Sequence, residues 1–499
     1  MSTTTSTAVT PQLAREIGLL GLIATAICAM IGVGINIIPF MIQRSQPGVG
    51  ATVPLVFLIT AVPAGLAALC YAMLSSAMPR AGGSYVYATR ALRPFPGFLA
   101  SFAQWFGLSM GMGVVAYLFV PMLRDTLATA GWPRLAPVFD EPSIRVPIAL
   151  AAIWSFWWVN QRGIKTYERT VVVMTAAMIA GPLIMSVTGF LAGPGDFEAA
   201  IARGEVTPPP VAPLPEFTIA RFMGAAVILF SSFIGFDAIS QAGGEARNPS
   251  RNLPRSILIA IGAVALYYVL FTAAVYNAVP WEHIYRVSLV RDVSAPALLA
   301  PPMPAWLGVI MLLTVTVAIL DSIPSVMLAN SRMIYAFSQD RIFPAVFGRV
   351  HPRFRTPHNA TTLTAVAGSL SVLGCAFAGD FFLGVDLLVV SMLVNFFLMA
   401  LAVLTFPSVN PELYGHVRFL RSRRTQMAVA SASLALLGGL LAVQVVMDLR
   451  SDAPWYLKST TSWSVTMALG ALIFLRSWRA LRREGIDPAR DIFRQLPEA

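Results

Sequence analysis

Charged residues are scarce in this 499-residue chain: only 12% of its residues are Asp, Glu, Lys or Arg, whereas 57% are hydrophobic. A soluble globular protein carries about 25% charged residues. The deficit excludes an ordinary soluble enzyme, a disordered protein and a collagen-like fibre. The length suits about a dozen membrane helices, because each needs about 20 apolar residues and a short connection.

Cysteine and lysine are rare as well. The three cysteines, Cys28, Cys70 and Cys375, lie in apolar runs and are too scattered for a disulfide framework or a zinc site. We therefore expect neither a resident metal nor a cofactor. Lysine occurs only at Lys165 and Lys458, so arginine supplies nearly all of the basic charge, and the formal net charge is +11. In a membrane chain the first question about such charge is which loops hold it.

Twelve apolar runs have the length of a membrane span. They lie at about 17–43, 52–78, 95–122, 145–160, 170–193, 219–240, 254–279, 305–335, 359–379, 383–407, 426–447 and 460–478. The loops after the even-numbered runs are all net positive, whereas the other loops are neutral or acidic apart from Arg44. Because positive loops stay in the cytoplasm, this pattern predicts a multi-pass protein of the plasma or inner membrane with both termini cytoplasmic. The basicity then reflects contact with the lipid bilayer and orientation in it, and we expect no nucleic-acid partner.

The first and the sixth run contain features that ordinary membrane helices lack. The first holds the stretch IGVGINIIP, with Gly32, Gly34 and Pro39, and the sixth holds FSSFIGFDAISQAGGEARNP, with Gly235 and Asp237. Glycine weakens a helix, and unwound backbone needs partners for its polar groups. A pair of interrupted helices five positions apart is the best sequence indication of a transporter binding site. The alternative is that these glycines only allow neighbouring helices to pack closely.

Four stretches resemble the amino acid–polyamine–organocation superfamily of secondary transporters, in its amino acid permease branch. They are MIGVGINIIP at 30–39, YAMLSSAMPRAGGSYVYATRAL at 71–92, FSSFIGFDAISQAGGEARNPSRNLPRSI at 230–257 and NSRMIYAFSQDRIFP at 330–344. The resemblance implies an all-α integral membrane protein with twelve transmembrane helices. It also implies a LeuT-like inverted five-plus-five repeat, with helices 1 and 6 broken and two further C-terminal helices. The parts would be a cytoplasmic tail at 1–16, the first repeat at 17–216, the second at 217–407, and helices 11 and 12 with a cytoplasmic tail at 408–499.

The same resemblance implies a central substrate site built largely from backbone. Its expected residues are Met30, Ile31, Gly32, Val33, Gly34, Leu108, Ser231, Ile234, Phe236 and Val326. The N–H groups around Gly32 to Gly34 would bind a carboxylate, and the carbonyls of Met30, Ser231 and Ile234 an amine. Oppositely oriented backbone dipoles suit the two ends of a zwitterion. The remaining positions are apolar, so we expect a neutral amino acid of small to medium size.

Two acids lie deep in the apolar runs, where charge is costly and usually functional. For Asp237 the resemblance suggests a gate or a proton sensor, and the alternative is a carboxylate that caps the unwound segment. Asp321 stands beside Ser322 and Ser325, and Pro324 frees a nearby carbonyl. These oxygens could bind Na⁺, or Asp321 could carry a proton. We prefer Asp321 as the coupling residue; the alternative is a structural hydrogen bond to a neighbouring helix.

A cytoplasmic gate is the last expected site. Arg80 and Arg90 flank the loop between runs two and three, where they could pair with Glu245 or with phospholipid headgroups. The alternative is that both arginines only anchor the loop at the membrane surface.

The sequence thus predicts a transporter that imports an amino acid, coupled to H⁺ or Na⁺, and not an enzyme. The motifs of a membrane enzyme are missing from the sequence. An exchanger, or a carrier of small amines or inorganic cations, is the main alternative within transport. A channel and an amino acid sensor without much transport are more distant alternatives. A monomer and a homodimer are both open.

Overall fold

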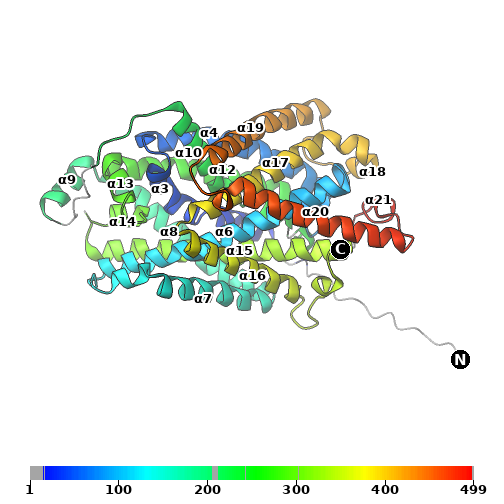
Figure 1. Cartoon of the computed structure of the whole chain (residues 1–499), viewed down its shortest axis with the longest axis horizontal. Coiled ribbons are helices and arrows are strands. Elements are labelled where there is room, and N and C mark those ends of the chain that lie inside the picture. The colour runs from blue at the N-terminus through cyan, green and yellow to red at the C-terminus, as the bar shows by residue number, and fades with distance from the viewer. Residues whose placement is uncertain (1–14, 16, 205–211, 242, 302, 497–499) are drawn as a thin grey trace.

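The computed structural model describes residue 15 and residues 17–204, 212–241, 243–301 and 303–496, and it is helical. The expected tail at 1–16 therefore lies almost wholly outside the described residues. The long helices run roughly parallel to one axis (Figure 1). The short helices α9 (Pro194–Ala202), α13 (Trp281–Ser288) and α14 (Ala295–Leu299) lie at one end of this bundle, which we call the α13 end. The short helix α21 (Pro488–Asp491) lies at the other, the α21 end.

Nine helices in the described part of the chain are long and apolar enough to cross a membrane. They are α4 (Val53–Ala77), α6 (Pro94–Thr129), α7 (Pro142–Gln161), α8 (Ile164–Leu191), α12 (Pro249–Ala278), α15 (Ala305–Gln339), α16 (His358–Ala378), α17 (Phe382–Val409) and α19 (Arg423–Arg450). Each coincides with one of the expected apolar runs. The protein is an all-helical, multi-span membrane protein, as the composition predicts.

The first expected span is broken. Helix α1 (Leu19–Met30) stops before Ile31 and Gly32, the short helix α2 (Val33–Asn36) follows, and α3 (Ile38–Ser45) completes the run. Proline suits the start of α3, because Pro39 has no N–H to leave unpaired in the first turn. The run therefore divides where its glycines and its proline predict.

The sixth expected span is broken in the same way. Helix α10 (Ile219–Phe230) continues into a 3₁₀ turn, η3 (Ser231–Phe233), and the chain unwinds before α11 (Ala238–Gln241) and the second turn η4 (Gly243–Glu245). The last expected span is a helix too, α20 (Ser459–Arg483), but it is not among the nine strongly apolar ones. The number of twelve spans and the inverted repeat stay predictions.

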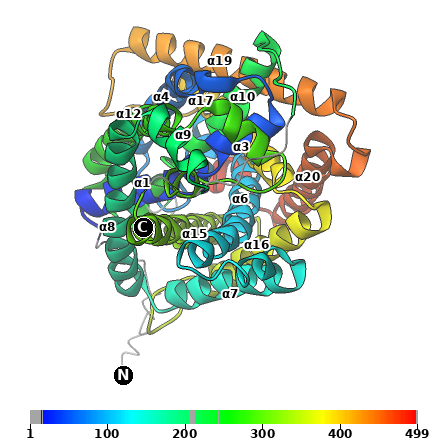
Figure 2. The same cartoon turned by 90° about the vertical axis from the view of Figure 1, so that its left-hand side faces the viewer.

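Viewed along the bundle, α6 and α15 lie near the middle, while α7, α8, α19 and α20 lie at the periphery (Figure 2). The outer helices expose large apolar side chains, for example Val173 and Leu183 on α8 and Leu472 on α20. Such surfaces are stable in lipid, where the helix satisfies its own backbone polar groups. The helices α1, α6, α15 and α17 and the turn η3 carry the candidate site.

Candidate functional site

The two helix breaks touch each other near the centre of the bundle. Gly235 has a φ of 129°, and a Cβ there would lie 2.6 Å from the carbonyl of Ala29 at the end of α1. Ser232 donates a hydrogen bond of 2.5 Å to the carbonyl of Gly34. Only glycine tolerates both the positive φ and the close approach at position 235. The close-packing role of these glycines and the breaks in the helices are therefore two aspects of one arrangement.

Tyr268 on α12 holds the breaks together. Its hydroxyl oxygen lies 2.7 Å from the carbonyl oxygen of Met30 and 2.8 Å from that of Ser232. A tyrosine hydroxyl has a single proton and donates to one carbonyl at a time. One of the two carbonyls is thus always left for another donor.

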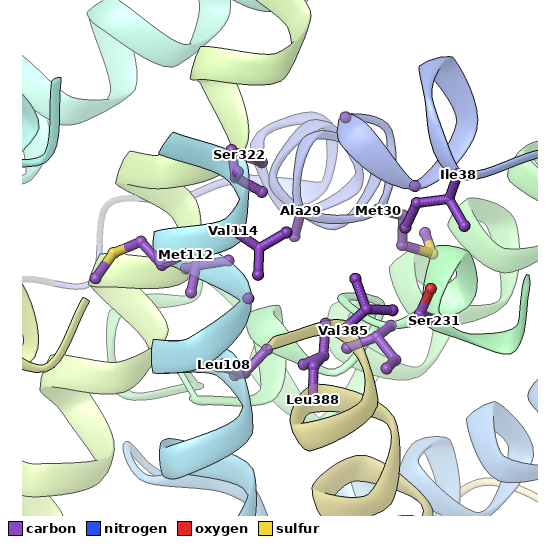
Figure 3. A pocket seen from close by; sticks show the side chains of 16 residues that line it. Ala29, Met30, Ile38, Leu108, Met112, Val114, Ser231, Ser322, Val385 and Leu388 are labelled. Atoms are coloured by element: carbon purple, nitrogen blue, oxygen red, sulfur yellow. The ribbon is translucent and has the colours of Figure 1, made fainter. Parts of the chain in front are cut away.

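A cavity of about 70 Å³ opens beside the breaks. It is lined by Ala29, Met30, Gly32, Gly34, Ile38, Leu108, Gly111, Met112, Val114, Val115, Ser231, Ile234, Ser322, Val326, Val385 and Leu388. Figure 3 shows how α1, α3, α6, η3, α15 and α17 surround it, with the two serines as its polar side chains. The hydroxyl oxygen of Ser231 is buried without a hydrogen-bond partner among the described residues. A buried polar atom without a partner is costly, so Ser231 is poised to bind a ligand or a water.

Seven of the ten expected substrate residues line this cavity: Met30, Gly32, Gly34, Leu108, Ser231, Ile234 and Val326. Ile31 belongs to the unwound backbone beside Gly32 but is not among the lining residues. The side chain of Val33, the first residue of α2, lies outside the described part of the structure. Phe236 is not among the lining residues either. It packs against Phe396 and Tyr71, with ring centroids 5.1 and 5.6 Å apart, in a buried aromatic cluster.

The sequence analysis missed several lining residues. Gly111 and Val115 follow Leu108 by three and seven positions on one face of α6, and this helical periodicity could have identified them. Val385 and Leu388 belong to α17, a helix that holds none of the ten expected substrate residues.

Asp321 directly precedes Ser322, which lines the cavity, and it lies on the side of α15 that faces α1 and α8. Both of its carboxylate oxygens are buried without a hydrogen-bond partner among the described residues. Cys28 on α1 and Thr175 on α8 lie beside this carboxylate. The sulfur of Cys28 lies 2.9 Å from the hydroxyl oxygen of Thr175. The neighbouring Ser322 approaches Gly32: a Cβ on that glycine would lie 3.3 Å from the serine hydroxyl.

Ser325 lies on the same side of α15, 3.2 Å from the hydroxyl of Tyr167 on α8. Its own hydroxyl points back to the carbonyl of Asp321 at 3.5 Å. The expected coupling residues 321, 322 and 325 therefore share one region between α15, α1 and α8, next to the cavity.

Asp237 lies apart from this region, in a network of buried amides. It accepts hydrogen bonds from the Gln104 side chain and from the N–H of Gly235, the latter at 3.3 Å. Gln241 donates to Gln104 at 3.1 Å and to Ser84 at 2.8 Å. The contact with Gly235 favours the alternative in which Asp237 caps the unwound segment, and a role in gating stays a prediction.

The arrangement of the expected cytoplasmic gate differs from the predicted one. Glu245 pairs with Arg332 on α15 at 2.7 Å, rather than with Arg80 or Arg90. The reason is geometric, because Glu245 on η4 is buried against Arg332 of α15, and each of the two residues is only 1% exposed. The backbone of Arg80 packs against Gly243, on the same 3₁₀ turn.

Arg90, in α5 (Gly83–Ala91), makes a two-pronged ion pair with Asp340, which follows α15, at 2.7 and 3.1 Å. The same guanidinium donates to the carbonyls of Ile492 and Gln495 in the C-terminal segment. Val326 of the cavity and Asp340 are fourteen positions apart on one helix, about 21 Å at 1.5 Å per residue. The two ion pairs therefore form successive layers between the cavity and the α21 end.

A third ion pair lies on the other side of the cavity. Arg44, at the end of α3, contacts Asp380 before α17 at 3.2 Å and Asp292 before α14 at 3.8 Å. The cavity is lined by Ile38, which precedes Arg44 on α3, and by Val385, which lies on α17 after Asp380. Charged contacts thus tie the cavity-lining helices together towards both ends of the bundle.

A multi-span helical bundle with a small central cavity between two broken helices is typical of a membrane transporter. A family model described as amino acid permease matches residues 17–473, nearly the whole chain. The chain belongs to the amino acid permease family. It is a secondary transporter of small solutes of the amino acid or amine type, and not an enzyme.

Individual relatives are distant and differ in what they carry. A methylthioribose transporter of Bacillus subtilis is 26% identical over 424 residues, which cover 82% of this chain and 84% of that protein. The low-affinity putrescine importer PlaP of Escherichia coli is 28% identical over 364 residues, which cover 72% of this chain and 72% of that protein. The vacuolar cationic amino acid transporter 2 of Arabidopsis thaliana is 26% identical over 80% of this chain, which spans only 61% of that longer protein.

Proposed function

We propose that the protein imports a neutral amino acid across the plasma membrane by alternating access, with its α21 end in the cytoplasm, and that Asp321 couples this import to a proton. The observation that carries the proposal is the cavity itself. It joins unwound backbone to the unpartnered hydroxyl of Ser231, and it is otherwise apolar.

The helix breaks supply groups for both ends of an amino acid. The first N–H groups of α2, which begins at Val33, have no partner within the helix and suit a carboxylate. The carbonyl of Met30 suits an amine. Because Tyr268 can satisfy either Met30 or Ser232, an arriving amine can take the Met30 carbonyl while the tyrosine donates to the other. Binding then leaves no carbonyl unpaired.

The side-chain part of the cavity favours a neutral substrate. Leu108, Met112, Val385 and Leu388 surround it, and no carboxylate is among its lining residues. A cation buried without an opposite charge costs several kcal/mol. Asp237, the acid that an amine substrate would need, is occupied by Gln104 and Gly235. These contacts support an amino acid with an apolar side chain over putrescine or arginine.

The surroundings of Asp321 support a proton rather than Na⁺ as the coupling ion. A hard cation such as Na⁺ needs several oxygen ligands around it. The side chains beside the carboxylate are a thiol, Cys28, and one hydroxyl, Thr175. A buried carboxylate with so few partners is best stabilised by taking up a proton. Since Ser322 follows Asp321 on α15 and its hydroxyl approaches Gly32, protonation and substrate binding can influence each other through α1.

Competition of uptake tests the substrate. The protein in proteoliposomes, with a labelled neutral amino acid as tracer, is challenged with the twenty common amino acids and putrescine. We expect competition by small and medium apolar amino acids. Strong competition by arginine, glutamate or putrescine alone would contradict a neutral substrate. A tracer that binds but never enters the vesicles would indicate a sensor, and uptake only into preloaded vesicles an exchanger.

A further inference from the structure

A second pocket opens on the outside of the bundle, between the beginnings of α1 and α8. Its volume is about 840 Å³. It is lined by Gly18, Leu19, Leu20, Gly21, Lys165, Glu168, Arg169, Val172, Val173 and Arg247. None of these residues lines the central cavity. The start of α1 contacts α8, which lies at the periphery of the bundle (Figure 2), where the bundle meets lipid.

The charge in this pocket is strongly one-sided. Arg169 and Arg247 have exposed side chains, Lys165 lies one helical turn before Arg169, and Glu168 is the one acid among the lining residues. The carboxylate of Glu168 lies against α1, 3.7 Å from the place of a Cβ on Gly21. Among the described lining residues the basic side chains outnumber the acidic one, and Arg169 and Arg247 are exposed at the surface, which suits an anion.

The first turn of α1 adds backbone donors to the same place. Gly18 is its N-cap and provides no side-chain cap, so the first N–H groups of the helix have no partner within it. The partial positive charge of a helix N-terminus reinforces the attraction of the arginines for a phosphate group.

Apolar side chains stand directly beside this basic pocket. Leu20 is 81% exposed and Val173 is 69% exposed, and Val172 is exposed as well. Val172 and Val173 follow Arg169 by three and four positions, so they lie one turn further into the membrane on the same face of α8. A ligand that fills the whole site therefore needs an anionic head and an apolar tail.

We propose that this pocket binds the phosphate headgroup of an anionic phospholipid, whose acyl chains lie along Leu20, Val172 and Val173. Basic pockets between membrane helices on the cytoplasmic side recognise such headgroups. The lipid ties the start of α1 to α8 and to Arg247. The N–H of Arg247 donates to the carbonyl of Ile17, so the lipid strengthens the attachment of the segment that leads into the broken helix.

Direct lipid binding tests this site. The purified full chain in detergent is titrated with phosphatidylglycerol and with phosphatidylcholine, and bound lipid is counted by native mass spectrometry. We expect preferential binding of phosphatidylglycerol to the unaltered chain. In the triple variant Lys165→Gln, Arg169→Gln, Arg247→Gln, the apparent affinity for this lipid should fall roughly tenfold or more, since each basic residue contributes about 1 kcal/mol near a lipid surface.

A control variant that removes the same number of positive charges elsewhere distinguishes a specific lipid site from general electrostatic attraction between the protein and anionic lipid. The triple variant Arg349→Gln, Arg353→Gln, Arg424→Gln removes three exposed arginines elsewhere and should keep the preference. Arg169→Gln alone should cause a partial loss. Equal losses in both triple variants, or unchanged binding in the first, would overturn the proposal. Full displacement of the lipid by glycerol phosphate at similar concentration would also overturn it, because the ligand would then be a free phosphate. This readout does not depend on transport, so it is separate from the proposed function.

Discussion

Arg332 and Glu245 form an ion pair of 2.7 Å inside the protein, with side chains only 1% and 2% exposed. It connects η4, which follows the sixth-span break, to the same helix that carries Asp321 and Val326. Removing one partner of a buried pair leaves an uncompensated charge and costs about 3–5 kcal/mol. We therefore expect Glu245→Gln to lower the thermal unfolding midpoint in detergent markedly.

Two further variants separate this pair from an ordinary surface contact. The double variant Glu245→Gln, Arg332→Met should recover much of the loss, because no lone charge stays buried. Arg341→Gln, which breaks a half-exposed ion pair with Glu484, should cost at most about 1 kcal/mol. A single variant as stable as the unaltered chain would contradict the burial of the pair.

Arg44 should control access to the cavity from the α13 end. It bridges α3 and α17 through Asp380 and also lies 5.4 Å from the ring centroid of Phe382. We expect Arg44→Gln to raise, several-fold, the rate at which an impermeant thiol reagent outside the cell labels a Val385→Cys reporter, with Arg44→Lys intermediate. The native cysteines are buried, and Arg44→Gln without the reporter measures their background. An unchanged rate would show that the arginine does not hold the cavity closed.

Leu388 should set the size of the substrate. It lines the cavity opposite Gly111, where a Cβ would lie 3.0 Å from the leucine side chain. Leu388→Ala should shift the ratio of kcat/KM towards larger neutral amino acids by roughly tenfold, and Leu388→Phe should shift it the other way. Leu398→Ala, on the same helix but away from the cavity, should leave the ratio unchanged. If Leu398→Ala and Leu388→Ala had equal effects, the size selection would lie elsewhere.

The C-terminal segment should stay docked through Phe493. This ring is 3% exposed, lies under the Arg90 guanidinium at 5.1 Å and packs against Trp478. Phe493→Ala removes about 1 kcal/mol of cation–π attraction in addition to the buried area, so amide hydrogen exchange in residues 485–496 should become faster. Gln495→Ala keeps the carbonyl that accepts from Arg90 and should change little. Equal exchange in both variants would contradict this docking.

The helical, multi-span fold and the place of the breaks could be predicted from the sequence because both depend on local features. Long apolar runs specify spans, and glycine and proline close together weaken a helix locally, as they do around Gly32, Pro39 and Gly235. Because the breaks were predicted, the backbone segment at Met30, Gly32 and Gly34 that lines the cavity was predicted with them.

The polar partners could not be predicted, because they depend on how distant segments approach each other. Arg332 reaches Glu245 across 87 positions, and Arg90 reaches Asp340 across 250. Nothing in the local sequence distinguishes Arg332 from other arginines, and Phe236 shares a motif with residues that line the cavity although it packs elsewhere. Only the rotation of each helix about its axis decides these contacts.

The central claim is that Asp321 couples a proton to substrate movement through the cavity. Labelled amino acid uptake into proteoliposomes, with pH and sodium gradients imposed separately, tests it most directly. We predict that an inward proton gradient alone drives accumulation by the unaltered chain. Asp321→Asn should keep binding and exchange but lose accumulation, while Asp386→Asn on α17 serves as the matched control and should keep it. Accumulation by Asp321→Asn equal to that of the unaltered chain would contradict the account.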